Sequence, residues 1–139
     1  MKYDLIIAGT GAAGLSAALY AGRYRMKTLV IGDSFGGYTS IAGPIENYPG
    51  AKKVDGFDLM LVMKEQAVEV GAEIIDGRVT SLEKGDGFFT LTTAKGETYP
   101  GATVDKGVIA LGVDLDPSPA FGFEFLADTI ELFLRKPIQ

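Results

Sequence analysis

Residues 3–31 read YDLIIAGTGAAGLSAALYAGRYRMKTLVI, and this stretch decides the fold. The apolar run at residues 3–8 predicts a β-strand, and glycines follow it at once. Residues 15–25 are rich in alanine and have apolar residues at helical spacing, and residues 27–31 form a second apolar run. Strand, glycine turn, helix and strand in this order predict a βαβ unit with parallel strands that are buried on both faces.

The turn between the first strand and the helix has the pattern Gly-x-Gly-x-x-Gly at residues 9–14. This pattern indicates a dinucleotide-binding turn when a strand precedes it and a helix follows it, as predicted here. The first glycine permits the tight turn, the second lets a pyrophosphate approach the backbone, and the third lets the helix pack closely on the strand. The helix N-terminus adds amide donors and partial positive charge. The predicted pyrophosphate site comprises Gly9, Gly11, Ala12, Ala13 and Gly14.

The acidic residue that commonly binds the ribose in such folds is expected at the end of the second strand. Here that strand ends in Val30-Ile31-Gly32, and Asp33 follows one position later. Asp33 is a candidate ligand of the ribose hydroxyls and equally a candidate cap of the turn.

The middle of the chain predicts a long loop and then a helix. Residues 32–50 contain many glycines and prolines without a sustained period, and a loop of this length is commonly functional. Residues 55–70 suit an amphipathic helix that is capped near Asp55, ended by Gly71, and apolar at positions 57, 60, 61, 67 and 68. The acidic residues Asp55, Asp58 and Glu65 on it are read as a solvated face rather than a metal or catalytic site.

The last part of the chain is rich in β-forming residues. A parallel strand at residues 73–75 leads into an antiparallel meander of about three strands, because turn-forming pairs such as Asp76-Gly77 separate the β-rich segments. A final parallel strand is predicted at residues 106–111, and an amphipathic helix at about residues 120–135. We therefore predict an α/β, Rossmann-like three-layer fold with helices on one face of a parallel sheet and the meander on the other.

The amino-acid composition excludes several classes of function. The 139 residues are enough for one compact domain, and a net charge of −5 provides no basic surface for nucleic acid or anionic lipid. The sequence has no cysteine and no histidine, so it offers neither a redox dithiol nor the usual zinc ligands, and no catalytic residue is assigned. Residues 5–22 are uncharged, but their glycines make a poor membrane helix. A cytoplasmic location is expected.

Six segments, in this order, resemble the FAD-binding domain of bacterial and archaeal low-molecular-weight thioredoxin reductases, in the pyridine nucleotide-disulfide oxidoreductase superfamily. They are the opening stretch at residues 3–32, then FGG, IENYPG, DGFDLM, GAEIIDGRVTSL and VIALG. The resemblance covers residues 1 to about 113. It implies that the chain binds FAD and belongs to a flavoprotein oxidoreductase.

The resemblance also implies further cofactor-binding residues. Asp33 and the residues up to Gly37 would pass near the ribose and adenine. Gly36, Gly37 and Tyr38 would begin the flavin-proximal loop, Asn47 would bind the isoalloxazine ring, and Val79 would offer its backbone to adenine. The segment that would line the dinucleotide is Ala110, Leu111 and Gly112.

The chain departs from that family in several ways. Tyr38 replaces the usual Gln, and Leu111-Gly112-Val113 replaces the usual Thr-Gly-Ala. The NADPH-binding domain with its CxxC dithiol and the later Gly-Asp segment are absent, which predicts a truncated family domain at residues 1–113. Residues 114–139 are predicted to be a helical tail that packs on this domain, or on a partner chain in a homodimer. Stand-alone activity is therefore left open.

Two alternatives to an FAD-binding oxidoreductase domain remain. One is a non-catalytic module for NAD or another adenine dinucleotide, and the other is a structural or interaction domain that has lost the cofactor.

Overall fold

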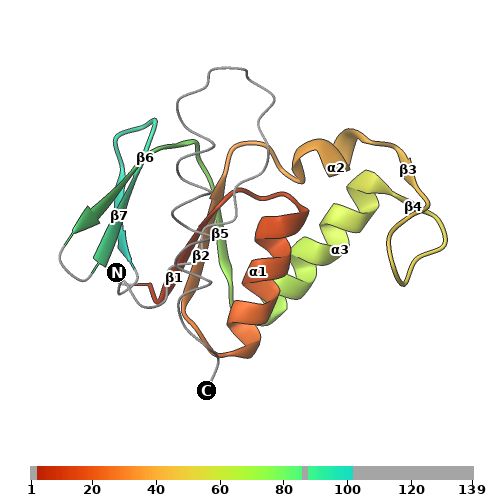
Figure 1. The fold of residues 1–139 in the computed structure, drawn as a ribbon, viewed down its shortest axis with the longest axis horizontal. Helices are drawn as coiled ribbons and strands as arrows, with labels where there is room; N and C mark the ends of the chain where they lie inside the picture. Colours follow the sequence, from red (N-terminus) through yellow and green to blue (C-terminus); the bar gives the residue numbers. More distant parts are fainter. Residues whose placement is uncertain (1–2, 86–87, 102–139) are drawn as a thin grey trace.

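A computed structural model describes residues 3–85 and 88–101 (Figure 1). Its elements are β1 (Leu5–Ala8), α1 (Ala12–Arg23), β2 (Thr28–Gly32), α2 (Gly37–Ile41), β3 (Pro44–Ile45), β4 (Val54–Asp55), α3 (Gly56–Glu69), β5 (Glu73–Asp76), β6 (Val79–Gly85), β7 (Phe88–Thr93) and β8 (Thr98–Gly101). The predicted strand at residues 106–111, the predicted helix at 120–135 and the predicted site residues Ala110, Leu111 and Gly112 lie outside the described residues. Within the described ranges, no helix is long and apolar enough to cross a bilayer.

The central sheet is parallel and has the order β1-β2-β5. Ala8 pairs with Ile31, and Gly32 pairs with Asp76, so the carboxyl ends of the three strands lie at one edge. The predicted βαβ unit is confirmed, and the third strand is one residue longer than predicted. This edge is where parallel α/β folds place their ligands.

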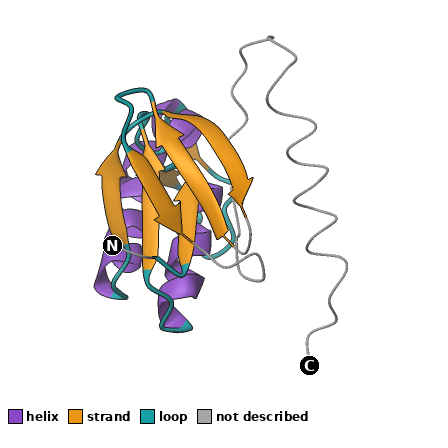
Figure 2. Ribbon diagram, turned by 90° about the vertical axis from the view of Figure 1, so that its left-hand side faces the viewer, coloured by secondary structure: helices purple, strands orange, loops and turns teal. Residues whose placement is uncertain are grey.

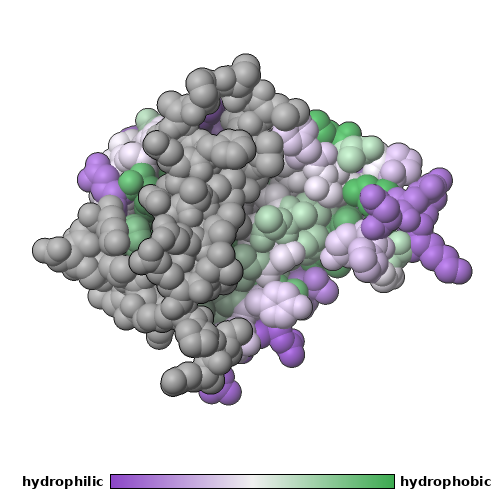
Figure 3. Space-filling model, viewed as in Figure 1, coloured by the Kyte–Doolittle hydropathy of each residue, from purple (hydrophilic) through white to green (hydrophobic). Residues whose placement is uncertain are grey.

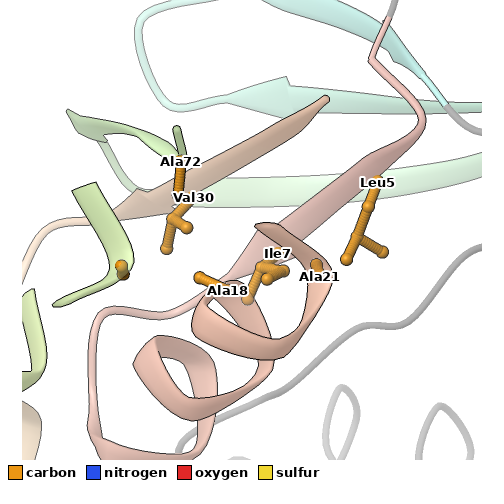
Figure 4. Close-up of a cluster of buried hydrophobic side chains, with 7 residues drawn as sticks. Leu5, Ile7, Ala18, Ala21, Val30 and Ala72 are labelled. Atoms are coloured by element: carbon orange, nitrogen blue, oxygen red, sulfur yellow. The ribbon is translucent and has the colours of Figure 1, made fainter. Parts of the chain in front are cut away.

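The sheet lies between two layers because strand side chains alternate between its faces. Residues of one face, among them Ile7 and Val30, pack with Ala18 of α1 and Ala67 of α3 (Figure 4). Side chains of the other face, among them Ile31, pack with Leu91 of β7. Figure 2 shows the β6-β7-β8 meander in front of the parallel sheet, with the helices behind it. The predicted three-layer α/β architecture with an antiparallel meander is confirmed.

Helix α3 forms where it was predicted, but only part of its predicted apolar face is buried: Met60 and Ala67 are fully buried. The Asp55 side chain caps the helix by accepting a hydrogen bond from the Phe57 backbone amide at 2.9 Å. Of the apolar positions named above, 57, 61 and 68 are exposed. The residues that α3 buries are Gly56, Leu59, Met60, Met63 and Ala67. Apolar residues occupy both sides of this helix, so the position of α1 and α2 decides which side is buried, and spacing alone does not.

The predicted loop at residues 32–50 contains short regular elements. Helix α2 has five residues, and β3 pairs with β4 in an antiparallel ladder of two residues per strand. Elements this short have no detectable hydrophobic period, so the pattern of the sequence could not reveal them. Figure 3 shows strongly hydrophilic surface at the end of the molecule that carries β3 and β4.

Helices α1 and α3 end in the same backbone motif with different residues. After α1, the amides of Arg25 and Met26 donate to the carbonyls of Gly22 and Ala21 at 2.8 and 3.0 Å. After α3, the amides of Gly71 and Ala72 donate to the carbonyls of Val68 and Ala67 at 2.9 and 3.0 Å. Both are Schellman caps, which need a residue with positive φ. Gly71 meets this need at φ 96°, whereas Arg25 adopts φ 59° with a side chain.

We therefore expect Arg25→Gly to stabilise the protein by roughly 0.5–1 kcal/mol, because glycine removes the steric cost of the left-handed conformation. Gly71→Ala is the matched control at the equivalent position of α3, and it should be destabilising by a similar amount. Urea unfolding of the two variants and the wild type measures both free energies. Loss of stability in Arg25→Gly would contradict the assignment of strain to this residue.

Candidate functional site

The glycine loop connects β1 to α1 at the carboxyl edge of the sheet. The Gly9 amide donates to the Ile31 carbonyl at 2.7 Å, and Gly9 has a φ of 115°, which favours glycine. Gly11 is the N-cap of α1 and has extended backbone angles. The amide of Leu15 donates to the Gly11 carbonyl at 3.0 Å and closes the first helical turn. The amides of residues 12–14 precede that bond and so have no intrahelical acceptor.

The second and third glycines of the motif have different surroundings. A Cβ added to Gly14 would overlap the carbonyl oxygen of Gly9, so the chain itself requires glycine there. Among the described residues, the nearest neighbour of a Cβ added to Gly11 would be the Gly36 carbonyl oxygen, at 3.9 Å. Residues 3–85 and 88–101 therefore leave open space beside Gly11. A side chain would enter this space directly before the first-turn amides of α1.

This space fits an anionic group. The first turn of α1 contains no acidic residue, and backbone amides and the helix dipole both favour negative charge at a helix N-terminus. The protein as a whole carries a net charge of −5, so a phosphate would be held by local amides rather than by a general positive field. The residues present are therefore compatible with the pyrophosphate of a dinucleotide.

A second loop, residues 33–36 between β2 and α2, lies against the glycine loop. The Thr10 hydroxyl donates to the Ser34 carbonyl at 3.1 Å, and the Gly36 amide donates to the Thr10 carbonyl at 3.0 Å. Gly36 is buried and has a φ of 73°. A Cβ added to Gly37 would lie 3.8 Å from the Gly11 Cα. The structure thus brings the predicted site residues of both loops together.

Gly32 at the end of β2 is closely packed against Thr10. A Cβ added there would lie 2.6 Å from the Thr10 Oγ1 and 2.8 Å from the Thr10 backbone nitrogen. Such distances cannot be accommodated without moving the glycine loop. An acidic side chain at position 32 is therefore incompatible with this arrangement, and Asp33, which is exposed, is the first carboxylate after the strand.

The 33–36 loop is anchored to α3 through Phe35. The Phe35 and Phe57 rings meet edge to face with centroids 5.8 Å apart, and the Lys64 Nζ lies 5.4 Å from the centroid of the Phe35 ring. Phe35 also packs against the buried cluster that contains Leu15 and Met60. Aromatic and cation–π contacts of this kind contribute modestly, but together they fix one side of the loop.

The other predicted residues lie farther along the structure. Tyr38 is in the first turn of α2 and is 53% exposed, and Asn47 is exposed in the connection between β3 and β4. Val79 begins β6 and packs against the core beneath the meander. The Gly77 amide donates to the Gly32 carbonyl at 3.3 Å, so the chain before Val79 lies at the same sheet edge as the glycine loop.

One perturbed side chain lies at the opposite, amino-terminal edge of the sheet. The Tyr3 hydroxyl donates to the Glu73 Oε2 at 2.7 Å, and this hydrogen bond, with burial, raises the pKa of Tyr3 to about 12. The Lys27 Nζ lies 5.5 Å from the Tyr3 ring centroid. These contacts tie the start of β1 to the start of β5 and are remote from the glycine loop, so we assign them a structural role.

The geometry of the glycine loop is accompanied by a family match. The family model of the pyridine nucleotide-disulphide oxidoreductases matches residues 3–131. The chain belongs to this family. The match continues beyond residue 113, where the recognisable motifs of the sequence end.

Individual relatives support this membership. The thioredoxin reductase of Treponema pallidum is 48% identical over 96 residues, which are 68% of this chain and 31% of that protein. The bifunctional thioredoxin reductase/thioredoxin of Mycobacterium leprae is 37% identical over 115 residues, which are 81% of this chain and 24% of that protein. The crystal structure of thioredoxin reductase from Streptococcus pyogenes superposes with a TM-score of 0.74 and 32% identity, covering 81% of this chain and 36% of that one. The chain thus spans well under half the length of the relatives it matches.

Sequence reasoning missed the residues that join the two loops. Thr10 occupies a variable position of the Gly-x-Gly-x-x-Gly pattern, and Phe35 lies in a loop without periodicity. Their roles come from contacts with Ser34 and with α3 that have no local signature in the sequence. The one usable signal was Gly32, because glycine at the end of a buried strand indicates close approach of another backbone.

Proposed function

We propose that this chain binds FAD and is the nucleotide-binding part of a thioredoxin-reductase-like flavoprotein oxidoreductase. The observation that carries the proposal is the open space that the described residues leave beside Gly11, directly before the first-turn amides of α1. The other two motif glycines have reasons within the chain itself, namely the φ of 115° at Gly9 and the close packing at Gly14. Family membership supports a flavin as the ligand, since the relatives described above are thioredoxin reductases.

In this proposal the amides of Ala12, Ala13 and Gly14 donate to the pyrophosphate oxygens at the positive end of α1. Asp33 and the backbone of Gly36 and Gly37 border the adenosine ribose. Tyr38 and Asn47 lie toward the flavin, and Val79 toward the adenine. The segment at residues 110–112 would line the dinucleotide.

Bound FAD would supply the redox chemistry through its isoalloxazine ring. The residues of this chain would bind and orient the cofactor. Because the 139 residues contain no cysteine, a dithiol for exchange with thioredoxin would have to come from another segment or another protein. We therefore assign cofactor binding to these residues. We assign no electron donor and no electron acceptor.

The test is a titration of the purified chain with FAD, followed by flavin fluorescence, with NAD and ADP as competitors. We expect saturable binding of one FAD and competition by both ADP and NAD, because both share its adenosine and pyrophosphate. Both should bind more weakly than FAD, because neither has the isoalloxazine ring. Thermal protection by NAD but not by FAD would favour the adenine-dinucleotide module instead. Protection by neither nucleotide would favour a domain that keeps the fold without the cofactor.

A further inference from the structure

We propose that Thr10 is a positioning residue that sets the spacing between the glycine loop and the 33–36 loop, and thereby the affinity for ligands that span both. The inference rests on the proposed function, because the ligand it concerns is the adenosine diphosphate half of FAD. Thr10 itself need not touch the cofactor.

Two hydrogen bonds of Thr10 join the two loops. Its hydroxyl donates to the Ser34 carbonyl at 3.1 Å, and its carbonyl accepts from the Gly36 amide at 3.0 Å. Thr10 also packs against Gly32 at the end of β2, where a Cβ would come within 2.6 Å of the Thr10 Oγ1. Thr10 is only 4% exposed, so these contacts are shielded from water. A buried, hydrogen-bonded side chain between two loops fixes their relative position.

The contact with Gly32 has a consequence for specificity. Thr10 occupies the space that an acidic side chain at the end of β2 would need. Recognition of the ribose hydroxyls, which a carboxylate at that position commonly provides, must then fall to the neighbouring loop. That loop begins with the exposed Asp33, and its next residue, Ser34, accepts the Thr10 hydrogen bond. The position of Thr10 therefore controls the place of the ribose-binding group.

Thr10→Val tests this role because valine keeps the branched shape and the backbone contact to Gly36 but removes the donor to Ser34. We expect the dissociation constant for FAD to rise about tenfold, as when one buried hydrogen bond that orders a binding loop is lost. Inorganic pyrophosphate needs the glycine loop alone, so its dissociation constant should stay within about twofold. Thr10→Ser keeps the hydroxyl and should restore FAD affinity to within about threefold of the wild type.

Thr28→Val is the matched control. Thr28 is 1% exposed and lies at the other end of β2, where its hydroxyl donates to the Met26 carbonyl at 3.1 Å. Both valine variants lose one buried side-chain hydrogen bond to a backbone carbonyl, so both should lower the melting temperature by a similar amount. Only Thr10→Val should weaken FAD binding. A merely structural role for Thr10 predicts the same FAD affinity in both variants.

The outcomes separate the two proposals. If the wild-type chain does not bind FAD, the proposed function fails and this inference fails with it. If the wild type binds FAD and Thr10→Val binds it equally well, the proposed function stands and the positioning role is wrong. Equal losses of affinity for FAD and for pyrophosphate in Thr10→Val would also overturn the inference, because they would place the effect in the glycine loop alone.

Discussion

Gly11→Val is expected to abolish FAD binding while leaving the fold intact. Gly11 has a φ of −79°, which any residue adopts, and within the described part of the chain an added Cβ would meet only the Gly36 carbonyl oxygen at 3.9 Å. The methyl groups of valine would fill the space before the first-turn amides and keep phosphate oxygens away. Loss of two charge-assisted hydrogen bonds, each worth about 1.5–3 kcal/mol, corresponds to an affinity loss of at least about 100-fold.

Fluorescence titration with FAD measures that loss, and thermal unfolding of the free chain measures stability. Because glycine is only a moderately good N-cap, its replacement should change the free energy of unfolding by about 1 kcal/mol or less. Gly11→Ala adds the Cβ but not the two γ-methyl groups of valine, so this variant should bind FAD with intermediate affinity. Undiminished FAD binding by Gly11→Val would show that the pyrophosphate lies elsewhere.

Local sequence patterns were sufficient for the central part of the fold. The βαβ unit was predictable because apolar runs flank a glycine turn, and the three-layer arrangement because strands buried on both faces need a layer on each side. The buried face of α3 was not predictable in the same way. Phe57 is 47% exposed and Leu59 is buried, although both are apolar, because packing against α1 and α2 selects the face.

In the candidate site too, one part was predictable from the sequence and another part was not. The glycine motif has a local signature, so its position at the start of α1 followed from the sequence. The arrangement of the 33–36 loop depends on contacts between residues far apart in the chain, such as Thr10 with Ser34 and Phe35 with Phe57. Local propensity contains no information on these pairs. The same holds for the short β3-β4 ladder, which is stabilised by its neighbours rather than by its own composition.

Gly14→Ala is expected to cause a large loss of stability. In an ordinary helix, replacing glycine by alanine is favourable by about 1 kcal/mol. Here the new Cβ would overlap the Gly9 carbonyl oxygen, lie 3.0 Å from the Gly9 carbonyl carbon and approach the Ile7 Cγ2 at 3.4 Å. The overlap is with backbone, so relief requires α1 to move away from β1 or the glycine loop to change shape. We expect a net destabilisation of about 2–3 kcal/mol, typical of overpacking in a closely packed core.

Urea unfolding measures this loss, and Ser16→Ala in the same helix is the control. Serine is a poorer helix former than alanine, so Ser16→Ala should stabilise by about 0.5 kcal/mol if only propensity matters. Opposite signs for the two variants would show that backbone approach, and not helix propensity, determines glycine at position 14. If Gly14→Ala were as stable as Ser16→Ala, α1 would not pack against the Gly9 turn as described. The first-turn amides would then lack the fixed position that pyrophosphate binding requires.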